Sequence, residues 1–156
     1  MSKSLVRVTA ALETAGAPVR IVEMDESTRT AEDAARAAGC HLDQIAKSII
    51  FRGQDSGHVV LFLTAGGNRV DPARAGAVAG QPLGKADAAL IRAETGFAIG
   101  GVAPIGHLRP VTAFFDPRLL DFPLVWAAAG TPRHVFAIAP DRLLAITGAC
   151  KADFVA

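Results

Sequence analysis

A glycine-rich segment, residues 94–107, constrains the fold of this chain more than any other feature of its sequence. Four glycines and a proline punctuate residues that are otherwise mostly apolar. The segment cannot be a regular helix, because proline lacks a backbone donor and glycine weakens helix interiors. It does not suit a solvated linker either, since side chains such as Phe97 and Val102 favour burial. We therefore predict a tight, partly buried loop whose backbone can approach a ligand closely.

The composition is that of an ordinary globular chain. With 156 residues, half of them apolar, we expect one domain over residues 1–156 with a substantial core. The formal net charge is +1 and no block of like charges occurs, so a wide basic stripe for nucleic acid is absent. No apolar run is long enough for a membrane span and the first residues do not resemble a secretory signal, which predicts a cytoplasmic protein. Cys40 and Cys150 are too few to form a disulfide framework.

The hydrophobic periodicity predicts short helices and strands in mixed order. Several strands are joined by loops too short for a crossover helix, which argues against a doubly wound parallel sheet. The pattern instead predicts an α+β (mixed α/β) fold, with a mostly antiparallel sheet or barrel-like core and surrounding helices. Helices are predicted to begin near residues 4, 30, 71, 85 and 140, with a helical turn at 43–46, and strands are predicted at 19–23, 47–52, 59–64, 111–115, 124–128 and 135–138.

Familiar catalytic motifs are missing. Residues 80–86 resemble a phosphate-binding loop, but the segment is one residue short and lacks the Ser or Thr after the lysine. The Gly-x-Ser-x-Gly elbow of hydrolases does not occur. The four histidines show no close ligand pair, so we expect neither a metal nor a cofactor.

Two polar residues have both an ordinary and a functional interpretation. Lys47 lies between a predicted helical turn and an apolar strand. It could extend from a strand edge to water, or it could present a partly buried ammonium to an anion or a developing oxyanion. His134 follows a predicted turn at 130–133 and could be an exposed turn residue or part of a site. These residues alone leave both alternatives open.

Five segments, in order along nearly the whole chain, resemble the YbaK/prolyl-tRNA synthetase-associated domain family and its free-standing branch. They are residues 27–35, 44–51, 83–87, 95–107 and 126–132. Members of this family are aminoacyl-tRNA deacylases. The resemblance implies a mixed α/β fold around a strongly bent sheet, and hydrolysis of the ester between a wrong amino acid and tRNA.

The resemblance also implies which residues form the site. The lysine corresponding to Lys47 is the key functional side chain of the family, and a Gly-x-x-x-Pro loop, here residues 100–104, lines the aminoacyl pocket. Backbone N–H groups of such a loop could donate to the oxyanion of a tetrahedral intermediate. The catalytic candidates are Lys47, Gly100, Gly101 and His134, and the substrate-binding candidates are Thr30, Ala98, Ile99, Val102, Ala103, Pro104, Gly130 and Thr131.

The implied substrate is a small mischarged amino acid on tRNA, with tRNA-Pro expected. Alanine, 2-aminobutyrate, serine and cysteine are all candidate amino acids, and the small apolar residues of the loop favour an alanine-like one. The low net charge suits contact with the acceptor end only; prolyl-tRNA synthetase is a candidate partner, whereas DNA and membranes are not expected. A non-catalytic module that binds tRNA or an aminoacyl-adenosine is the alternative, and a metal hydrolase is a more distant one.

Overall fold

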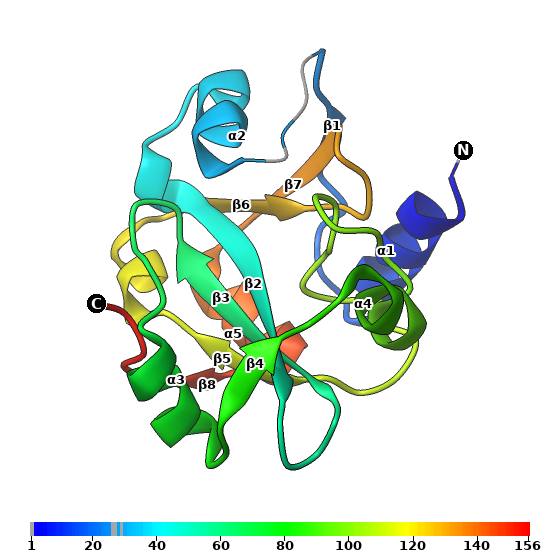
Figure 1. The fold of residues 1–156 in the computed structure, drawn as a ribbon. Coiled ribbons are helices and arrows are strands. Elements are labelled where there is room, and N and C mark those ends of the chain that lie inside the picture. Colours follow the sequence, from blue (N-terminus) through cyan, green and yellow to red (C-terminus); the bar gives the residue numbers. More distant parts are fainter. Residues whose placement is uncertain (1, 26–27, 29) are drawn as a thin grey trace.

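A computed structural model describes residues 2–25, 28 and 30–156. In these residues, five α-helices and two 3₁₀ turns surround an eight-stranded mixed sheet (Figure 1). The helical elements are α1 (Lys3–Thr14), α2 (Ala31–Ala38), η1 (Leu42–Gln44), α3 (Pro72–Ala79), α4 (Ala88–Thr95), η2 (Pro117–Asp121) and α5 (Pro140–Thr147). The strands are β1 (Ile21–Glu23), β2 (Ile45–Gly53), β3 (Val59–Ala65), β4 (Leu83–Lys85), β5 (Thr112–Phe115), β6 (Val125–Ala128), β7 (His134–Ile138) and β8 (Cys150–Lys151).

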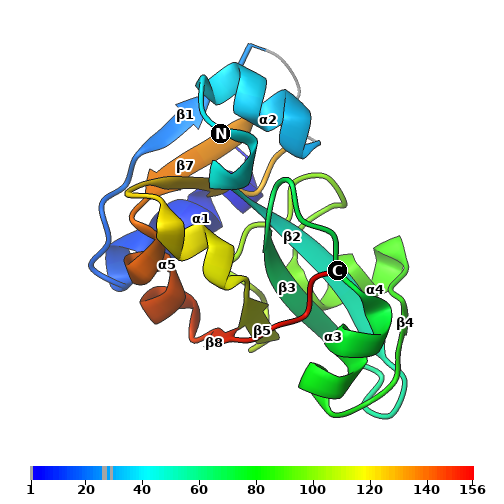
Figure 2. The same cartoon turned by 90° about the vertical axis from the view of Figure 1, so that its left-hand side faces the viewer.

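The strands of the sheet follow the order β1-β7-β6-β2-β3-β5-β8, and β4 pairs with β2 beside this path. Pairing is antiparallel for β1–β7, β6–β7, β2–β3 and β2–β4. It is parallel for β2–β6, β3–β5 and β5–β8. Strands β6 and β7 run across the direction of β2 and β3, and the helices lie around the outside (Figures 1 and 2). The predicted α+β architecture, with mostly antiparallel strands and outer helices, is confirmed.

Capping side chains determine where two of the helices begin. The Thr30 hydroxyl accepts a hydrogen bond from the Asp33 N–H at 3.1 Å and so begins α2, as its sequence predicts. Asp87 caps α4 in the same way, so this helix begins at Ala88 rather than at the predicted Lys85. Lys85 belongs to β4 instead.

Sheet pairing changes the predicted boundaries around β2. The helical turn predicted at 43–46 is only η1, and β2 begins at Ile45 because Ile45 and Ala46 pair with β6. Strands β4 and β8 escape prediction, since two or three residues are too few to show a period.

The hydrophobic core lies on both faces of β3, which is buried along its whole length as its continuous apolar sequence predicts. Leu61 and Leu63 belong to the main cluster, which packs α1, α4 and α5 against the sheet. Phe62 points to the other face and packs against Phe154 in a second cluster beneath α3. No helix among the described residues is both long and apolar enough to span a membrane.

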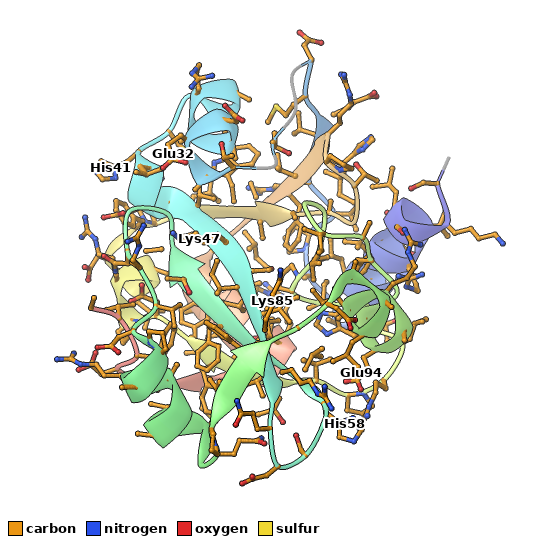
Figure 3. All side chains as sticks on the ribbon, viewed as in Figure 1. Glu32, His41, Lys47, His58, Lys85 and Glu94 are labelled. Atoms are coloured by element: carbon orange, nitrogen blue, oxygen red, sulfur yellow. The ribbon has the colours of Figure 1, made fainter. Side chains whose placement is uncertain are left out.

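The glycine-rich segment forms a loop whose two ends meet. The Arg109 N–H donates to the Glu94 carbonyl oxygen at 3.3 Å. The Glu94 carboxylate is almost fully buried, accepts from the Val59 N–H at 3.0 Å, and lies 2.8 Å from His58 Nδ1 (Figure 3). Residues 101–105 inside the loop are buried. The prediction of a tight, partly buried loop is confirmed.

His107 stabilises this loop from within. Its Nε2 lies 2.7 Å from the Ala103 carbonyl oxygen, which can only accept, so Nε2 carries the hydrogen. Burial lowers the pKa of His107 below its ordinary value, and the positive charge of Arg7 acts in the same direction. The folded protein therefore favours the neutral ring.

This preference gives a testable pH dependence. Because the folded pKa of His107 is below the unfolded one, the unfolded chain takes up the proton first as the pH falls, and stability is lost from about pH 7 downward. We expect His107→Gln, which keeps an N–H donor for Ala103, to lose less unfolding free energy than the wild type between about pH 7.5 and 5.5. Urea unfolding at several pH values measures this. Identical profiles for the two proteins would show that His107 does not contribute.

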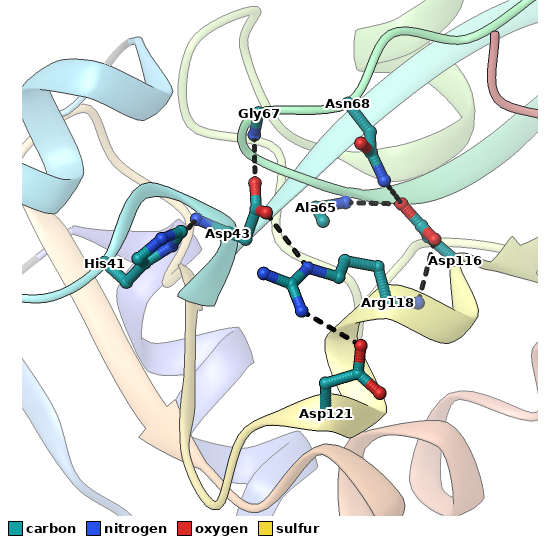
Figure 4. Close-up of polar contacts among 8 residues, drawn as sticks. All are labelled: His41, Asp43, Ala65, Gly67, Asn68, Asp116, Arg118 and Asp121. Atoms are coloured by element: carbon teal, nitrogen blue, oxygen red, sulfur yellow. Dashed lines mark hydrogen bonds and ion pairs between the residues drawn. The ribbon is translucent and has the colours of Figure 1, made fainter.

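A buried carboxylate holds the turn after β3 (Figure 4). Asp116, only 2% exposed, accepts hydrogen bonds from the Ala65 N–H at 3.1 Å, from Asn68 Nδ2 at 2.8 Å and from the Arg118 N–H at 3.0 Å. Three donors on two segments thus converge on one side chain. The turn at residues 65–68 is thereby fixed against the start of η2.

Removing this carboxylate would leave buried donors without an acceptor. We expect Asp116→Ala to lower the unfolding free energy by about 2–4 kcal/mol. The matched control is Asp153→Ala, since Asp153 is exposed and pairs with Arg74 at 3.3 Å on the surface. That control is expected to change stability by less than about 1 kcal/mol. Equal effects of the two substitutions in urea unfolding would contradict this role of Asp116.

Candidate functional site

A cleft of about 930 Å³ opens along β2. This volume lies within the range of small-molecule sites, about 300–1,000 Å³. Its floor is β2, from Ile45 to Phe51, and its walls are the start of α2, strand β4 with Ala86, strand β6 and part of the glycine-rich loop. The lining is mainly apolar, and the charged side chains on it among the described residues are Glu32, Lys47 and Lys85.

The cleft exists because two different strands share one edge of β2. Strand β6 pairs with Ile45 and Ala46, whereas β4 pairs only with residues 51–53. Between them, residues 47–50 pair with β3 on the other edge and with no further strand among the described residues. The sheet is therefore open at its centre.

The open edge of β2 presents backbone donors to the cleft. The Gly53 N–H donates to the His58 carbonyl oxygen, toward β3. In an antiparallel pair, alternate residues direct their peptide groups to opposite edges, so those of Ser48 and Ile50 point away from β3. Their N–H groups lie outside both the β6 and the β4 pairing. An acceptor bound in the cleft can use them.

Lys47 supplies a partly desolvated cation beside this edge (Figure 3). Its Nζ donates to the Gly66 carbonyl oxygen at 3.1 Å, which leaves two of its three hydrogens for other acceptors. Partial burial lowers the pKa of Lys47, and Arg69 adds to this effect, whereas Glu32 opposes it. Lys47 is therefore a half-buried side chain that lines the cleft and donates to a backbone carbonyl.

The acceptor of the Lys47 ammonium sits in a rigid turn. Asp43 Oδ1 accepts from the Gly67 N–H at 2.8 Å, and Asp43 Oδ2 accepts from Arg118 Nε at 3.0 Å (Figure 4). A side chain at Gly66 would collide with the Leu42 carbonyl oxygen, so glycine allows the turn to pack on η1. These contacts fix the carbonyl that orients Lys47.

Only part of the glycine-rich loop reaches the cleft. Ile99, Gly100 and Val102 line it, whereas Ala98, Ala103 and Pro104 do not. The Gly101 N–H donates to the Ala98 carbonyl oxygen at 3.1 Å, so this predicted oxyanion donor is already paired. A Cβ at Gly101 would lie 2.8 Å from the backbone of Thr131. Gly101 therefore permits close packing of the loop on the next turn.

His134 lies in a different hollow from Lys47. On β7, Val135 lines the cleft, and the neighbouring His134 lines a second hollow of about 580 Å³ together with Thr131 and Glu23. His134 Nδ1 lies 2.6 Å from Thr131 Oγ1, and its Nε2 lies 3.9 Å from a Glu23 carboxylate oxygen. The structure therefore does not bring His134 to Lys47. Gly130 lies in the turn between β6 and β7, outside the cleft lining.

Of the predicted site residues, the cleft therefore brings together Lys47, Gly100, Ile99, Val102 and Thr30.

Sequence reasoning missed Ser48, which also lines the cleft. Its hydroxyl oxygen is buried and has no hydrogen-bond partner within the part of the chain that the structure describes. Leaving a buried hydroxyl unpaired costs about 1–3 kcal/mol, so a bound molecule that pairs with Ser48 would recover this free energy. No signal in the sequence indicates it, because the position follows from the register of β2. No three His, Cys, Asp or Glu side chains of residues 2–25, 28 and 30–156 gather as metal ligands.

Comparison with known proteins shows which family the chain is similar to. Residues 25–146 match the family model described as an aminoacyl-tRNA editing domain. A curated relative, the uncharacterised protein YwhH of Bacillus subtilis (strain 168), is 30% identical over 123 residues, which are 79% of this chain and 78% of the relative.

Solved structures show the same fold. A protein described as a proposed trans-editing enzyme for prolyl-tRNA synthetase has a TM-score of 0.92 and 48% identity, covering 100% of this chain and 99% of that one. The hypothetical protein APE2540 has a TM-score of 0.87 and 27% identity, covering 96% and 99%. The matched family segment contains α2, the lysine strand β2 and the glycine-rich loop that together enclose the cleft. This chain belongs to the aminoacyl-tRNA editing domain family.

Proposed function

We propose that this protein is a deacylase that removes a small mischarged amino acid from tRNA, with tRNA-Pro as its substrate. The observation that carries the proposal is the half-buried Lys47 ammonium in an apolar cleft with free backbone donors beside it. Membership of the editing family and the likeness to a proposed prolyl-tRNA synthetase trans-editing enzyme support it.

The reaction is hydrolysis of an ester. A water oxygen attacks the carbonyl carbon and forms a tetrahedral oxyanion; the bond from that carbon to the ribose oxygen then breaks. The departing ribose oxygen receives the proton that the water loses, through the neighbouring ribose hydroxyl of the substrate. The products are the free amino acid and deacylated tRNA, and no oxidant or reductant is needed.

The protein would accelerate this reaction by positioning and by electrostatic stabilisation. The Ser48 N–H or the Ile50 N–H on the open edge of β2 can donate to the carbonyl oxygen as it becomes negative; the two lie about 6.6 Å apart along the strand, so one oxygen accepts from one of them only. The Lys47 ammonium, anchored on Gly66, adds positive charge on the same strand. The Gly101 N–H is not given this role because it already donates to Ala98.

The apolar lining of the cleft supports an apolar amino acid as the one removed. Ile99 and Val102 of the loop and Trp126 of β6 contribute apolar walls. An alanine or 2-aminobutyrate side chain suits such walls better than serine, whose hydroxyl would lose hydrogen bonds to water. One methylene discriminates by only about 1–3 kcal/mol, so rejection of proline would depend on steric fit against the walls of the cleft.

The proposed partner is the acceptor end of the tRNA. The proposed place of action is the cytoplasm, where charged tRNA is present. A net charge of +1 provides little nonspecific attraction, so binding is expected to depend weakly on salt. Prolyl-tRNA synthetase could deliver the mischarged tRNA directly. Failure of the two proteins to associate in a pull-down, with tRNA present, would remove this partner.

The direct test is deacylation of tRNA-Pro charged with alanine, 2-aminobutyrate, serine, cysteine or proline. We expect the wild type to hydrolyse a small non-cognate ester and to spare the proline ester. Lys47→Ala should lower kcat/KM by about 10²–10³-fold, because it removes a preorganised cation from a desolvated site. The matched control is Lys151→Ala, since Lys151 is exposed on β8 and does not line the cleft.

Three outcomes would contradict the proposal. Full activity of Lys47→Ala would remove the lysine from the mechanism. Binding of charged tRNA without hydrolysis of any ester would favour the non-catalytic binding module. Loss of hydrolysis in the presence of a chelator, restored by a divalent metal, would favour a metal hydrolase.

A further inference from the structure

One arginine of α1 holds the glycine-rich loop from behind. Arg7 Nε donates to the Gly106 carbonyl oxygen at 2.9 Å, and Arg7 Nη2 donates to the Thr95 carbonyl oxygen at 3.4 Å. These two carbonyls lie near opposite ends of the loop. The guanidinium carbon also lies 4.5 Å from the centre of the Phe97 ring, which is fully buried. A single side chain therefore contacts the beginning, the aromatic anchor and the end of the loop.

Two glycines of the loop make room for this contact. Gly96 has a φ of +81°, and a Cβ there would collide with the Arg7 guanidinium. Gly106 has a φ of +78°, and a Cβ there would lie 3.3 Å from the Arg7 carbonyl oxygen. Both positions require the left-handed conformation that glycine tolerates. The contact with α1 thus accounts for Gly106, and at Gly96 it adds to the left-handed C-cap that ends α4.

Three other residues of the loop, Ile99, Gly100 and Val102, form a wall of the cleft, which Arg7 does not line. The loop also packs on the turn between β6 and β7, because a Cβ at Gly130 would lie 3.1 Å from the Phe97 ring and 3.0 Å from the Ser4 carbonyl oxygen. Helix α1, the loop and this turn form one packed unit. A movement of the loop relative to α1 would therefore move the cleft wall.

Arginine is the side chain suited to this position. Its planar guanidinium donates in two directions while its face lies on an aromatic ring. A lysine at the same place would keep the charge but could not donate to both carbonyls and stack at once. Helix α1 precedes residue 25, so this contact comes from outside the segment that matches the editing-domain family.

We propose that Arg7 is a positioning residue of the cleft, which holds the glycine-rich loop so that Ile99, Gly100 and Val102 face Lys47 across the bound ester. Arg7 itself does not line the cleft and does not touch the substrate. The inference rests on the proposed deacylase function for its effect on turnover, whereas its effect on the loop can be measured without any substrate.

The test compares Arg7→Lys with Arg142→Lys. Arg142 is a matched control because it also donates to a backbone carbonyl, that of Gly16 just after α1, at 2.7 Å, but lies away from the loop. Amide hydrogen exchange over residues 96–107, thermal unfolding, and kcat and KM for deacylation are measured on each full-length protein. A third variant, Arg7→Met, removes the charge as well.

We expect Arg7→Lys to speed exchange in residues 96–107 by at least tenfold and to lower kcat by at least tenfold, with less than a threefold change in KM. Arg142→Lys should change neither the exchange in residues 96–107 nor kcat, even if it lowers the melting temperature as much as Arg7→Lys does. If Arg7→Met does not fold, the Lys variant alone decides. A purely structural role would lower the melting temperature in both arginine variants and leave kcat unchanged.

Unchanged exchange in the loop of Arg7→Lys would overturn the inference. Faster exchange with an unchanged kcat would overturn it as well, because the loop would then be held by Arg7 without consequence for turnover. If the wild type hydrolyses no ester, the proposed function fails, and the inference is tested by amide exchange with a saturating non-hydrolysable alanyl-adenosine amide. The bound amide should then protect residues 96–107 from exchange at least tenfold less in Arg7→Lys than in the wild type, and equal protection would contradict the role of Arg7.

Discussion

The structure depends on the way β2 is shared between neighbours. One edge pairs with β3 over nearly the whole strand, whereas β6 takes the beginning of the other edge and β4 its end. A sheet closed along both edges would bury the peptide groups of residues 47–50 in ordinary strand pairs. The interruption instead leaves backbone donors next to Lys47 in a cleft with apolar walls. The chemistry proposed for this protein needs no dedicated nucleophile because the open edge and the ammonium already meet the needs of ester hydrolysis.

Rigid supports surround this opening on both sides. On one side, Asp116 and Asp43 hold the turn whose Gly66 carbonyl orients Lys47. On the other side, three groups of contacts hold the glycine-rich loop. They are the hydrogen bonds of the buried Glu94 carboxylate, the bond from His107 to the Ala103 carbonyl oxygen, and the contacts of Arg7. Each support is a buried or half-buried polar group with its partners satisfied. Such preorganisation is what electrostatic catalysis requires, since the donors must not reorganise during the reaction.

Local sequence signals predicted some elements, and a family resemblance predicted several residues that line the cleft. Thr30 caps α2 as its side-chain chemistry predicts, and the apolar run of β3 is buried on both faces. Lys47 was predicted from a family resemblance, and the cleft brings it together with Gly100 and Val102. These features depend on residues that are close together in the sequence, or on short motifs that can be recognised in it.

The remainder depends on long-range pairing, which a single sequence does not reveal. The Ser48 N–H lacks a strand partner because β6 pairs only with residues 45–46 and β4 only with residues 51–53. The direction of His134 follows from the register of β7 against β1, which turns its neighbour Val135 to the cleft. Gly96, Gly101 and Gly106 allow contact with other parts of the protein, namely Arg7 and Thr131, and only Gly100 borders the cleft. A glycine in a sequence thus indicates close approach without indicating what approaches.

The central claim is that the aminoacyl end of the substrate lies in the cleft on β2. Its most direct test is a ¹H–¹⁵N NMR titration of the full chain with a non-hydrolysable alanyl-adenosine amide. We expect the largest shift changes at the Ser48, Ile50 and Gly100 amides, with small changes at Thr131 and His134 in the second hollow. Changes concentrated at Thr131 and His134, with those of Ser48 and Gly100 unaffected, would contradict the account.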